Sequence, residues 1–384
     1  MVRCSGRVCE DPAQRSVWSR GPLRVVGRTL LGAAAFLYGI GARLHRVSMR
    51  ATLAGRGRPA CAVVSVGGLT VGGAGKTPLA ARLARALHER GWRVAIASRG
   101  YKGAGRERVT VVSDGRHVVS SVAVSGDESL LLAAHAPGVP VLVGRDRRVV
   151  AHRAVAAFDA QIVVLDDGFQ HHRVARDLDL VCIDGASGLG NRKLLPAGPL
   201  REPVASLRHA DWLCLVDGDA QPRGSERGVE DLRQRELVAS FEERGGQVLR
   251  GRRQPKTLVS LDRTQRRPLE WLSGRRVGLL SGVGQPGSVR RTLESLGACV
   301  VSERRFRDHH AYAPDDLRDL DPGPSAWLTT EKDALKILPE WLGGVGFWVL
   351  TIEFEIEEED AVLDRLEAQL REVGRLAARS AASA

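Results

Sequence analysis

The residues best suited to phosphate chemistry lie between positions 61 and 87 (CAVVSVGGLTVGGAGKTPLAARLARAL). An apolar run at 62–66 predicts a buried strand, a glycine-dense loop follows at 67–75, and Lys76-Thr77 begins a segment with helical periodicity. Phosphate oxygens need several backbone N–H groups at close range, which requires glycines without Cβ atoms and the positive end of a helix dipole. Lys76 can neutralise β- and γ-phosphate charge, and the Thr77 hydroxyl is placed to bind Mg²⁺.

The loop misses the general phosphate-loop pattern G-x-x-x-x-G-K-[ST] at one position. The first glycine of that pattern would fall at Thr70, although Gly67 and Gly68 lie just upstream. A glycine-rich turn between a strand and a helix would explain the glycines alone. It would not explain Gly75-Lys76-Thr77 at the start of the helix, so we interpret the stretch as a nucleotide-binding loop.

Two adjacent acids, Asp166 and Asp167, follow an apolar segment (162–165) that predicts another buried strand. An acid at the end of such a strand, downstream of a phosphate loop, is where a carboxylate that organises Mg²⁺ lies in this fold class. Two adjacent carboxylates repel one another unless a cation is present, which argues against a purely structural role.

Two further clusters are ambiguous from their residue types. Gly126-Asp127-Glu128 precedes a helical segment, where the acids could serve only as a helix cap and a first-turn charge. His309 and His310 precede a short helix and could simply be surface residues.

Composition limits the classes of partner. The length of 384 residues predicts two or three domains. The hydrophobic fraction of 43% is enough for a sizeable core. The net charge of +12 implies an anionic partner, which could be nucleic acid, an acidic membrane or a phosphorylated substrate. Only 4% of residues are aromatic and there is no zinc-finger or RNP-like stretch, so nucleic acid ranks below the other two. The six cysteines are dispersed and predict reduced core residues of a cytosolic protein.

The N-terminal region predicts a membrane-associating element. We expect a disordered tail at 1–21 and a helix at 22–50, in which an uncharged run is flanked by arginines. The run at 29–42 is shorter than the roughly 20 residues that a transmembrane helix needs, so we expect the helix to lie in the membrane interface. A cleaved signal peptide and a helix packed on the protein's own core are the alternatives.

The order of apolar and helical segments predicts an α/β fold with a phosphate-loop NTPase-like core, in which helices flank a parallel sheet. We assign this core to 51–246, including a charged, helical or loosely ordered connector at 217–246. A smaller α/β domain with a terminal amphipathic helix follows at 247–384.

Seven motifs, several of them individually unusual, occur in an order that resembles one family, the tetraacyldisaccharide 4′-kinases, which phosphorylate a lipid A precursor. Together they span most of residues 22–355. Where the family has Val-Gly-Asn this chain has Val66-Gly67-Gly68, whereas a threonine at position 70 is typical of the family. The motifs are VGGLTVGGAGKTP (66–78), SRGYKG (98–103), GDE (126–128), DDGFQH (166–171), LLPAGPLREP (194–203), FRDHHAY (306–312) and TEKDALK (330–336).

The resemblance implies transfer of the ATP γ-phosphate to the 4′-hydroxyl of a tetraacylated glucosamine disaccharide 1-phosphate, which gives lipid IVA. It implies ATP and Mg²⁺ as cofactors and no nucleic-acid partner. It places the enzyme, as a peripheral or monotopic protein, on the cytoplasmic face of the bacterial inner membrane. It also implies that a hinge joins the phosphate-loop core to the smaller domain.

Roles follow for the residues that match the family's motifs. Asp127 would be the general base acting on the sugar hydroxyl, with His309 as its partner, and Thr77, Asp166 and Asp167 would hold Mg²⁺. Because Asp127 and His309 belong to different predicted domains, we expect them to meet only when the domains close over substrate. The residues that would contact the nucleotide are Thr70, Val71, Gly72, Gly73, Ala74, Gly75, Lys76 and Thr77.

Two other functional classes fit part of the sequence. A phosphate-loop ATPase or GTPase acting as a maturation switch would share the loop but would need no membrane helix and no base in a sugar pocket. A non-catalytic basic module that binds membrane or nucleic acid could carry a relict loop, but the acids at 166–167 and the GDE stretch argue against it. An assay with labelled ATP and the disaccharide acceptor separates the three.

Overall fold

The computed structural model describes residues 22–51, 58–101, 103–105, 107–218, 227–284, 286–321 and 323–376. The expected tail at 1–21 lies outside the described residues, as do Lys102 of the SRGYKG motif and residues 219–226 of the connector. Residues 227–243 of the connector form a helix, in agreement with one of the two predicted forms.

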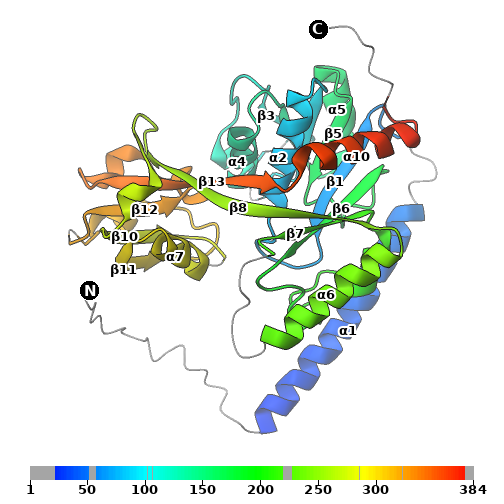
Figure 1. The fold of residues 1–384 in the computed structure, drawn as a ribbon, viewed down its shortest axis with the longest axis horizontal. Helices are drawn as coiled ribbons and strands as arrows, with labels where there is room; N and C mark the ends of the chain where they lie inside the picture. Colours follow the sequence, from blue (N-terminus) through cyan, green and yellow to red (C-terminus); the bar gives the residue numbers. More distant parts are fainter. Residues whose placement is uncertain are drawn as a thin grey trace.

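Thirteen strands in the described part of the chain form one continuous sheet (Figure 1). Their order is β11-β10-β12-β13-β8-β7-β6-β1-β5-β2-β4-β3, with β9 paired to β8. Most pairs are parallel, which confirms the predicted mixed α/β fold with a largely parallel sheet. The strands are β1 (Ala62–Gly68), β2 (Val94–Ser98), β3 (Thr110–Ser113), β4 (Val141–Val143), β5 (Ile162–Asp166), β6 (Leu178–Asp184), β7 (Trp212–Val216), β8 (Gln247–Ser260), β9 (Arg266–Arg267), β10 (Arg276–Ser281), β11 (Cys299–Arg305), β12 (Ala326–Thr330) and β13 (Phe347–Ile356).

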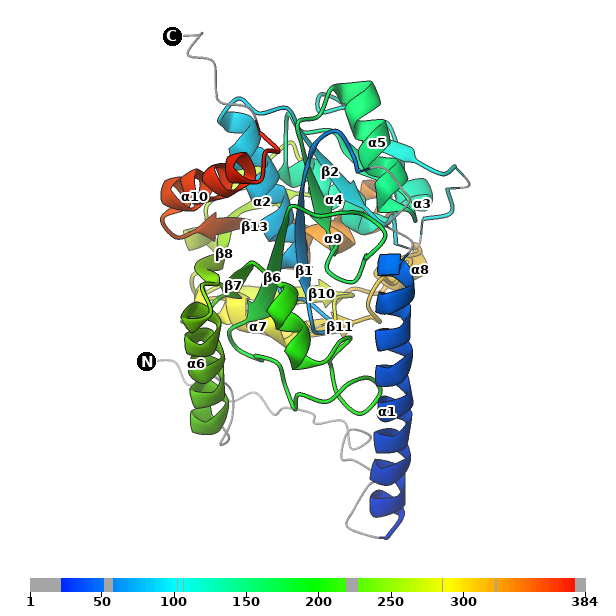
Figure 2. The same cartoon turned by 90° about the vertical axis from the view of Figure 1, so that its right-hand side faces the viewer.

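Helices cover both faces of the sheet because successive residues of a buried strand point to opposite sides. In β1, Val64 packs in the core under α2, α4 and α10, whereas Val63 packs under α5 (Figure 2). The α-helices are α1 (Pro22–Ala51), α2 (Lys76–Glu89), α3 (Val122–Ser125), α4 (Asp127–His135), α5 (Arg147–Phe158), α6 (Arg227–Glu243), α7 (Pro286–Ser295), α8 (Asp315–Arg318), α9 (Glu331–Ala334) and α10 (Glu359–Glu372).

Two long strands connect the phosphate-loop core to a second lobe, which contains β10, β11, β12 and α7 (Figure 1). β8 starts beside β7 in the core and continues antiparallel to β13, whose first residues pair with β12 in the second lobe. The end of β13 and all of α10 pack back on the core, through residues such as Phe354 and Leu366. The chain therefore crosses to the second lobe and returns within one sheet, whereas the expected division placed all of 247–384 in the smaller domain.

The N-terminal helix α1 is continuous and extends beyond the body of the protein in both views (Figures 1 and 2). Its apolar side chains Phe36, Leu37, Leu44 and Val47 are between 65% and 69% exposed. Ala35 is buried, and a Cβ at Gly39 would lie 2.8 Å from Leu194 Cδ1, so one narrow face contacts the body. None of the helices in the described ranges has the length and apolarity required to cross a bilayer.

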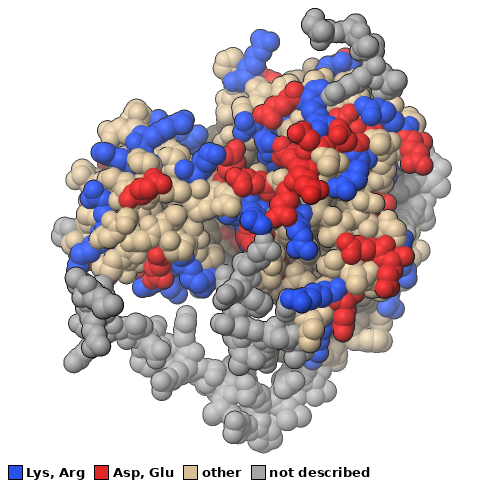
Figure 3. Space-filling model, viewed as in Figure 1, with Lys and Arg blue, Asp and Glu red and all other residues tan. Residues whose placement is uncertain are grey.

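The positive charge of the chain is not gathered into one patch on the face that Figure 3 shows. Basic and acidic side chains are interleaved there over both lobes. A large basic nucleic-acid footprint is therefore not visible on this face.

Candidate active site

The phosphate loop connects β1 to α2, as the sequence predicts. Gly75 has a φ of 79°, and a Cβ there would lie 2.8 Å from Val216 Cγ1, so this position requires glycine. The Lys76 ammonium donates to the Gly72 carbonyl at 3.1 Å. The loop thus has a left-handed glycine directly before α2 and Lys76 at the start of that helix, where a phosphate loop binds its ligand.

Two arginines that the sequence analysis missed hold the phosphate loop from outside. Arg201, in the LLPAGPLREP motif, donates to the Thr70 carbonyl at 3.1 and 3.2 Å. Arg253, on β8, donates to the Gly73 carbonyl at 3.0 Å. Asp184 and Asp217 fix the same Arg253 guanidinium at 2.8 and 2.7 Å. The motif containing Arg201 could have signalled its importance, whereas no local pattern marks Arg253.

Asp166 ends β5 directly beside the loop. Its carboxylate accepts hydrogen bonds from Thr77 Oγ1 and Ser98 Oγ, each at 3.2 Å. Burial, reinforced by the nearby Asp167 charge, raises the pKa of Asp166 to about 7. A hydroxyl and a carboxylate are oxygen ligands of the kind that a hard divalent cation prefers, and a cation would stabilise a carboxylate whose charge is otherwise disfavoured by burial. Phosphate oxygens and water would complete the coordination of such a cation. Thr77 and Asp166 therefore fit Mg²⁺.

Asp167 points to a different partner. Arg201 donates to both oxygens of this carboxylate at 2.8 and 3.0 Å, and Lys76 Nζ lies 3.8 Å away. Burial opposes ionisation, but Lys76 and Arg201 outweigh it, so the pKa of Asp167 is lowered. Within the described ranges, no group of three or more His, Cys, Asp or Glu side chains is arranged to hold a metal ion. The two carboxylates that were predicted to hold a metal thus have different partners, because Asp166 contacts Thr77 whereas Asp167 is bound by Arg201.

Asp127 and His309 are in contact. His309 Nδ1 lies 3.0 Å from each carboxylate oxygen of Asp127, although 182 positions separate the two residues. Both are largely buried, with side-chain exposures of 5% for Asp127 and 11% for His309. Asp127 and His309 therefore meet in this structure, and our expectation that they do so only on closure over substrate stays a prediction.

Lysines of the TEKDALK motif complete the pair. Lys332 Nζ lies 3.1 Å from His309 Nε2, and Lys336 Nζ lies 3.6 Å from Asp127 Oδ2. An ammonium group can only donate, so Nε2 accepts and Nδ1 carries the proton that is donated to Asp127. The ring of Tyr101 packs against the His309 ring, with centroids 5.3 Å apart. The TEKDALK and SRGYKG motifs indicated that these two lysines and this tyrosine matter, but they did not indicate which residues the side chains contact.

The neighbouring histidine has a different environment. His310 Nε2 lies 2.9 Å from Asp316 Oδ2, and its ring stacks on Phe306 at 4.5 Å between centroids. The structure therefore distinguishes the two adjacent histidines, and only His309 faces Asp127.

A cavity of about 520 Å³ lies between the two lobes, next to the phosphate loop. Its walls include Thr77 and Pro78 at the start of α2, Lys332 of the TEKDALK motif, and Ile352 of β13. This volume is within the usual range for small-molecule sites, and the cavity adjoins both halves of the candidate site.

Comparisons with known proteins agree on one family. The family model described as tetraacyldisaccharide-1-P 4′-kinase (LpxK) matches residues 27–371. A tetraacyldisaccharide 4′-kinase of Syntrophus aciditrophicus is 37% identical over 363 residues, covering 93% of this chain and 95% of the relative. One of Anaeromyxobacter sp. (strain K) is 43% identical over 333 residues, covering 85% and 84%. The crystal structure of LpxK from Aquifex aeolicus in complex with ATP aligns with a TM-score of 0.70 at 29% identity, covering 89% of this chain and 99% of that one.

Proposed function

The chain belongs to the tetraacyldisaccharide 4′-kinase family of lipid A biosynthesis, and we propose that it phosphorylates the 4′-hydroxyl of a tetraacylated disaccharide 1-phosphate with Asp127 as the general base. The observation that carries this proposal is the buried contact between Asp127 and His309. A kinase with a sugar acceptor needs a base for the hydroxyl proton, whereas a maturation switch or a membrane-binding module does not.

Each group at the pair has a distinct task in the proposed reaction. The Asp127 carboxylate accepts the proton of the acceptor hydroxyl while the hydroxyl oxygen bonds to the γ-phosphorus of ATP. The bond between the γ-phosphorus and the β–γ bridging oxygen breaks, which releases ADP. His309 donates Nδ1–H to Asp127, which orients the carboxylate. Lys332 fixes the tautomer of His309 through Nε2. These contacts hold the base in position before the proton moves.

The phosphate loop supplies the other half of the proposed site. Thr70 to Thr77 would surround the ATP phosphates, with Lys76 on the β- and γ-phosphates. Thr77 and Asp166 would hold Mg²⁺, which would offset the charge of the phosphates in the transition state. Asp167 would act through Arg201 and Lys76, which its carboxylate orients. The cavity between the lobes would take the nucleoside part of ATP.

We further propose that α1 binds the surface of the inner membrane on its cytoplasmic side. Its exposed Phe36, Leu37, Leu44 and Val47 can enter the interface between headgroups and acyl chains. Arg46 forms an ion pair with buried Glu202, the residue after Arg201, so the helix is attached to the loop that clamps Asp167. The helix would therefore bring the site to a substrate whose acyl chains remain in the bilayer.

The direct test is transfer of ³²P from γ-labelled ATP to a tetraacylated disaccharide 1-phosphate, followed by thin-layer chromatography. We expect a labelled product that carries a 4′-phosphate, and none with acceptor whose 4′-hydroxyl is blocked. Hydrolysis of ATP without labelled lipid would favour the maturation-switch class. No nucleotide turnover would favour the non-catalytic module.

Membrane attachment has its own test. Substituting Leu31→Asp and Phe36→Asp should move the protein from the membrane fraction toward the soluble fraction, because charged side chains are excluded from the apolar interface. Both positions are exposed, so the fold should persist. Release of the wild-type protein by high salt alone would indicate purely electrostatic attachment and contradict burial of these side chains.

A further inference from the structure

Asp333, in the TEKDALK motif, is a buried carboxylate to which the proposed reaction gives no task. It lies in α9, which packs against α4 of the core, and its exposed fraction is 0%. A buried carboxylate costs free energy unless it is paired and hydrogen-bonded. The partners of Asp333 therefore indicate its role.

One partner of Asp333 is local and one is remote. Thr330 Oγ1, at the N-cap of α9, accepts the Asp333 N–H at 3.2 Å and donates to Asp333 Oδ2 at 2.8 Å. In a capping box, the acidic side chain would return to the backbone N–H of the N-cap residue. Here Oδ2 accepts the N–H of Gly282, the residue after β10, at 2.9 Å. Asp333 thus holds a loop 51 positions away, which capping of α9 does not require.

The Gly282 loop in turn supports the backbone of His309. The Gly282 carbonyl accepts the His309 N–H at 3.3 Å. His309 has a φ of 60°, in the left-handed region that is strained for residues other than glycine. Such a conformation persists only where the surrounding structure imposes it. Two hydrogen bonds through Gly282 therefore link the buried carboxylate of Asp333 to the strained residue of the catalytic pair.

The second oxygen of Asp333 faces Lys336. Lys336 Nζ lies 3.4 Å from Asp333 Oδ1 and 3.6 Å from Asp127 Oδ2, so two buried carboxylates share one ammonium group. The Lys336 side chain is only 9% exposed, and its Nζ lies over the Tyr312 ring, 5.4 Å from the centroid. Asp333 therefore restricts the position of Lys336 next to the Asp127 carboxylate.

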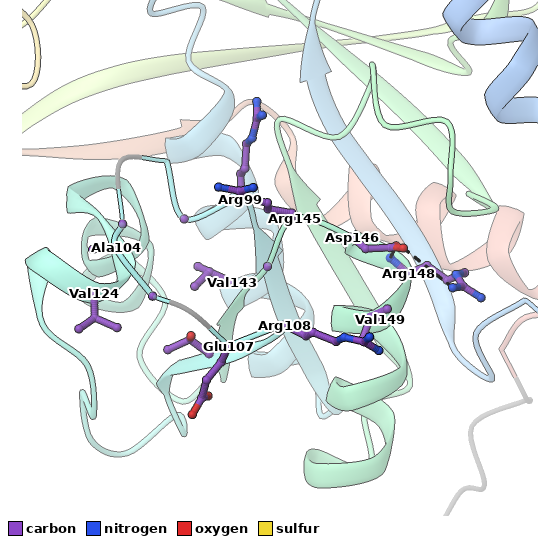
Figure 4. A pocket seen from close by; sticks show the side chains of 15 residues that line it. Arg99, Ala104, Glu107, Arg108, Val124, Val143, Arg145, Asp146, Arg148 and Val149 are labelled. Carbon is purple, nitrogen blue, oxygen red and sulfur yellow. Dashed lines mark hydrogen bonds and ion pairs between the residues drawn. The ribbon is translucent and has the colours of Figure 1, made fainter.

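In the described part of the chain, the core contacts the side chain of His309 rather than its backbone. Asp127 and Tyr101 both contact the imidazole ring. Close to Tyr101, the core has a cavity of about 710 Å³ whose lining residues all lie between positions 99 and 149 (Figure 4). Its walls include Arg99, Arg108, Arg145 and Arg148. The backbone N–H of His309 instead has its partner in the second lobe, at Gly282.

We propose that Asp333 is a positioning residue of the Asp127–His309 pair. It fixes the backbone of His309 through Gly282. It also fixes the Asp127 carboxylate through Lys336. The inference rests on the proposed function, in which Asp127 is the base, and a base acts only within hydrogen-bond distance of the proton that it removes. A small displacement of the base lowers turnover strongly, so loss of Asp333 should lower kcat rather than raise either KM.

Two substitutions separate the contacts of Asp333. Asp333→Asn keeps an oxygen that can accept the Gly282 N–H but removes the charge that faces Lys336, whereas Asp333→Ala removes both. With labelled ATP and the disaccharide acceptor, kcat should fall about tenfold for the asparagine variant, the scale of one hydrogen bond to a charged group. The alanine variant should lose about a hundredfold, but no more than His309→Ala loses. The KM values for ATP and acceptor should stay close to wild type.

A second comparison distinguishes positioning from a purely structural role. In an Asp127→Ala background, Asp333→Ala should lower kcat little further, because both paths from Asp333 end at the missing carboxylate. A purely structural role would lower the rates of both backgrounds by the same factor. Asp316→Asn is the matched control, since this carboxylate accepts the Ala313 N–H and contacts His310 in the neighbouring loop. Its kcat should stay close to wild type.

Three results would overturn the inference while leaving the proposed function intact. They are wild-type kcat in both Asp333 variants, the same fractional loss in the wild-type and Asp127→Ala backgrounds, and a loss that appears in KM instead of kcat. If circular dichroism shows that Asp333→Ala does not fold, the Asp333→Asn variant decides between these outcomes. Absence of phosphate transfer by the wild-type enzyme would instead overturn the proposed function, and this inference with it.

Discussion

The two ends of the candidate site are assembled in different ways. At the nucleotide end, Thr70 to Thr77 lie in one uninterrupted strand-loop-helix segment, and their shape follows from glycines and a helix start within that segment. At the acceptor end, Asp127 and His309 come from positions 182 residues apart and from different lobes. They meet because β8 and β13 carry the chain out to the second lobe and back.

This difference indicates which interactions each end depends on. The loop is shaped locally but is fixed by two remote arginines, Arg201 and Arg253. At the catalytic pair, Asp127 Oδ1 accepts the neighbouring Glu128 N–H at 3.0 Å, and the more distant Lys332, Lys336 and Tyr101 also contact the pair. We therefore expect substitutions of Asp127 and His309 to have non-additive effects on turnover. Near the loop, we expect large effects where a residue contacts the phosphates and smaller effects where it only supports the loop.

The largest expected effect is at the catalytic pair. Asp127→Ala and His309→Ala should each lower kcat by about 10²- to 10⁴-fold, the usual contribution of general base catalysis. The double variant should lose little more than the worse single variant, because residues that act as a unit are non-additive. Steady-state kinetics with labelled ATP would measure this.

His310→Gln is the matched control, since His310 contacts Asp316 and not Asp127. Its kcat should stay close to wild type. Losses that multiply in the double variant would separate the roles of Asp127 and His309, and a larger loss at His310 than at His309 would reject the assignment of the histidine.

A loss of at least about a hundredfold is expected for Lys76→Ala, the scale of removing one electrostatic contact to the transition state. Lys76 is the only lysine in the loop sequence 67–77, and its ammonium lies 3.1 Å from the Gly72 carbonyl oxygen. Lys256→Ala, which removes an exposed lysine paired with Glu353, serves as control. Near-normal turnover of the Lys76 variant would reject the phosphate-loop assignment.

A smaller effect is expected where a remote residue supports the local loop. Arg253→Gln removes the hydrogen bond to the Gly73 carbonyl, so the KM for ATP should rise about tenfold while the KM for acceptor changes little. Arg252→Gln changes the neighbouring residue of β8, which pairs with Glu357, and is the matched control. Unchanged ATP affinity of the Arg253 variant would show that the loop is shaped locally and needs no support from β8.

The last prediction concerns the pH dependence of stability at the DDGFQH turn and not turnover. Burial, together with the Arg147 charge, lowers the pKa of His171 from 6.5 to about 4, and its Nε2 accepts the Arg147 N–H at 3.2 Å. The folded protein therefore holds this histidine neutral. The resulting contribution to the free energy of unfolding is present above pH 6.5 and is lost as the pH falls toward 4, because the unfolded chain binds the proton first. Relative to His171→Asn, wild type should lose up to about 1.4 kcal/mol of unfolding free energy per pH unit in that window.

Chemical denaturation of both proteins at several pH values would measure this slope. A difference in unfolding free energy that stays constant between pH 4 and pH 6.5 would show that the proton does not distinguish the folded from the unfolded state at His171.

Several features could be predicted because they depend on short stretches of chain. The phosphate loop follows from Gly75-Lys76-Thr77 after a buried strand, and β13 at Phe347–Ile356 follows from its apolar pattern. The family followed from seven ordered motifs, and the comparisons confirm it. The motifs also predicted that Asp127 and His309 share one site, and the two side chains are in contact.

Only the tertiary structure decided how these parts meet. Pairing of β8 with both β7 and β13 placed α10 on the core and joined the lobes in one sheet, which no local pattern specifies because strand partners are chosen by long-range packing. The same packing separated Asp166 from Asp167, which are adjacent in sequence but face different partners. It also brought four arginines from separate segments around one cavity. Sequence determined which residue types are present at each local turn, whereas the environment that sets their charge and partners arises only when distant segments are buried together.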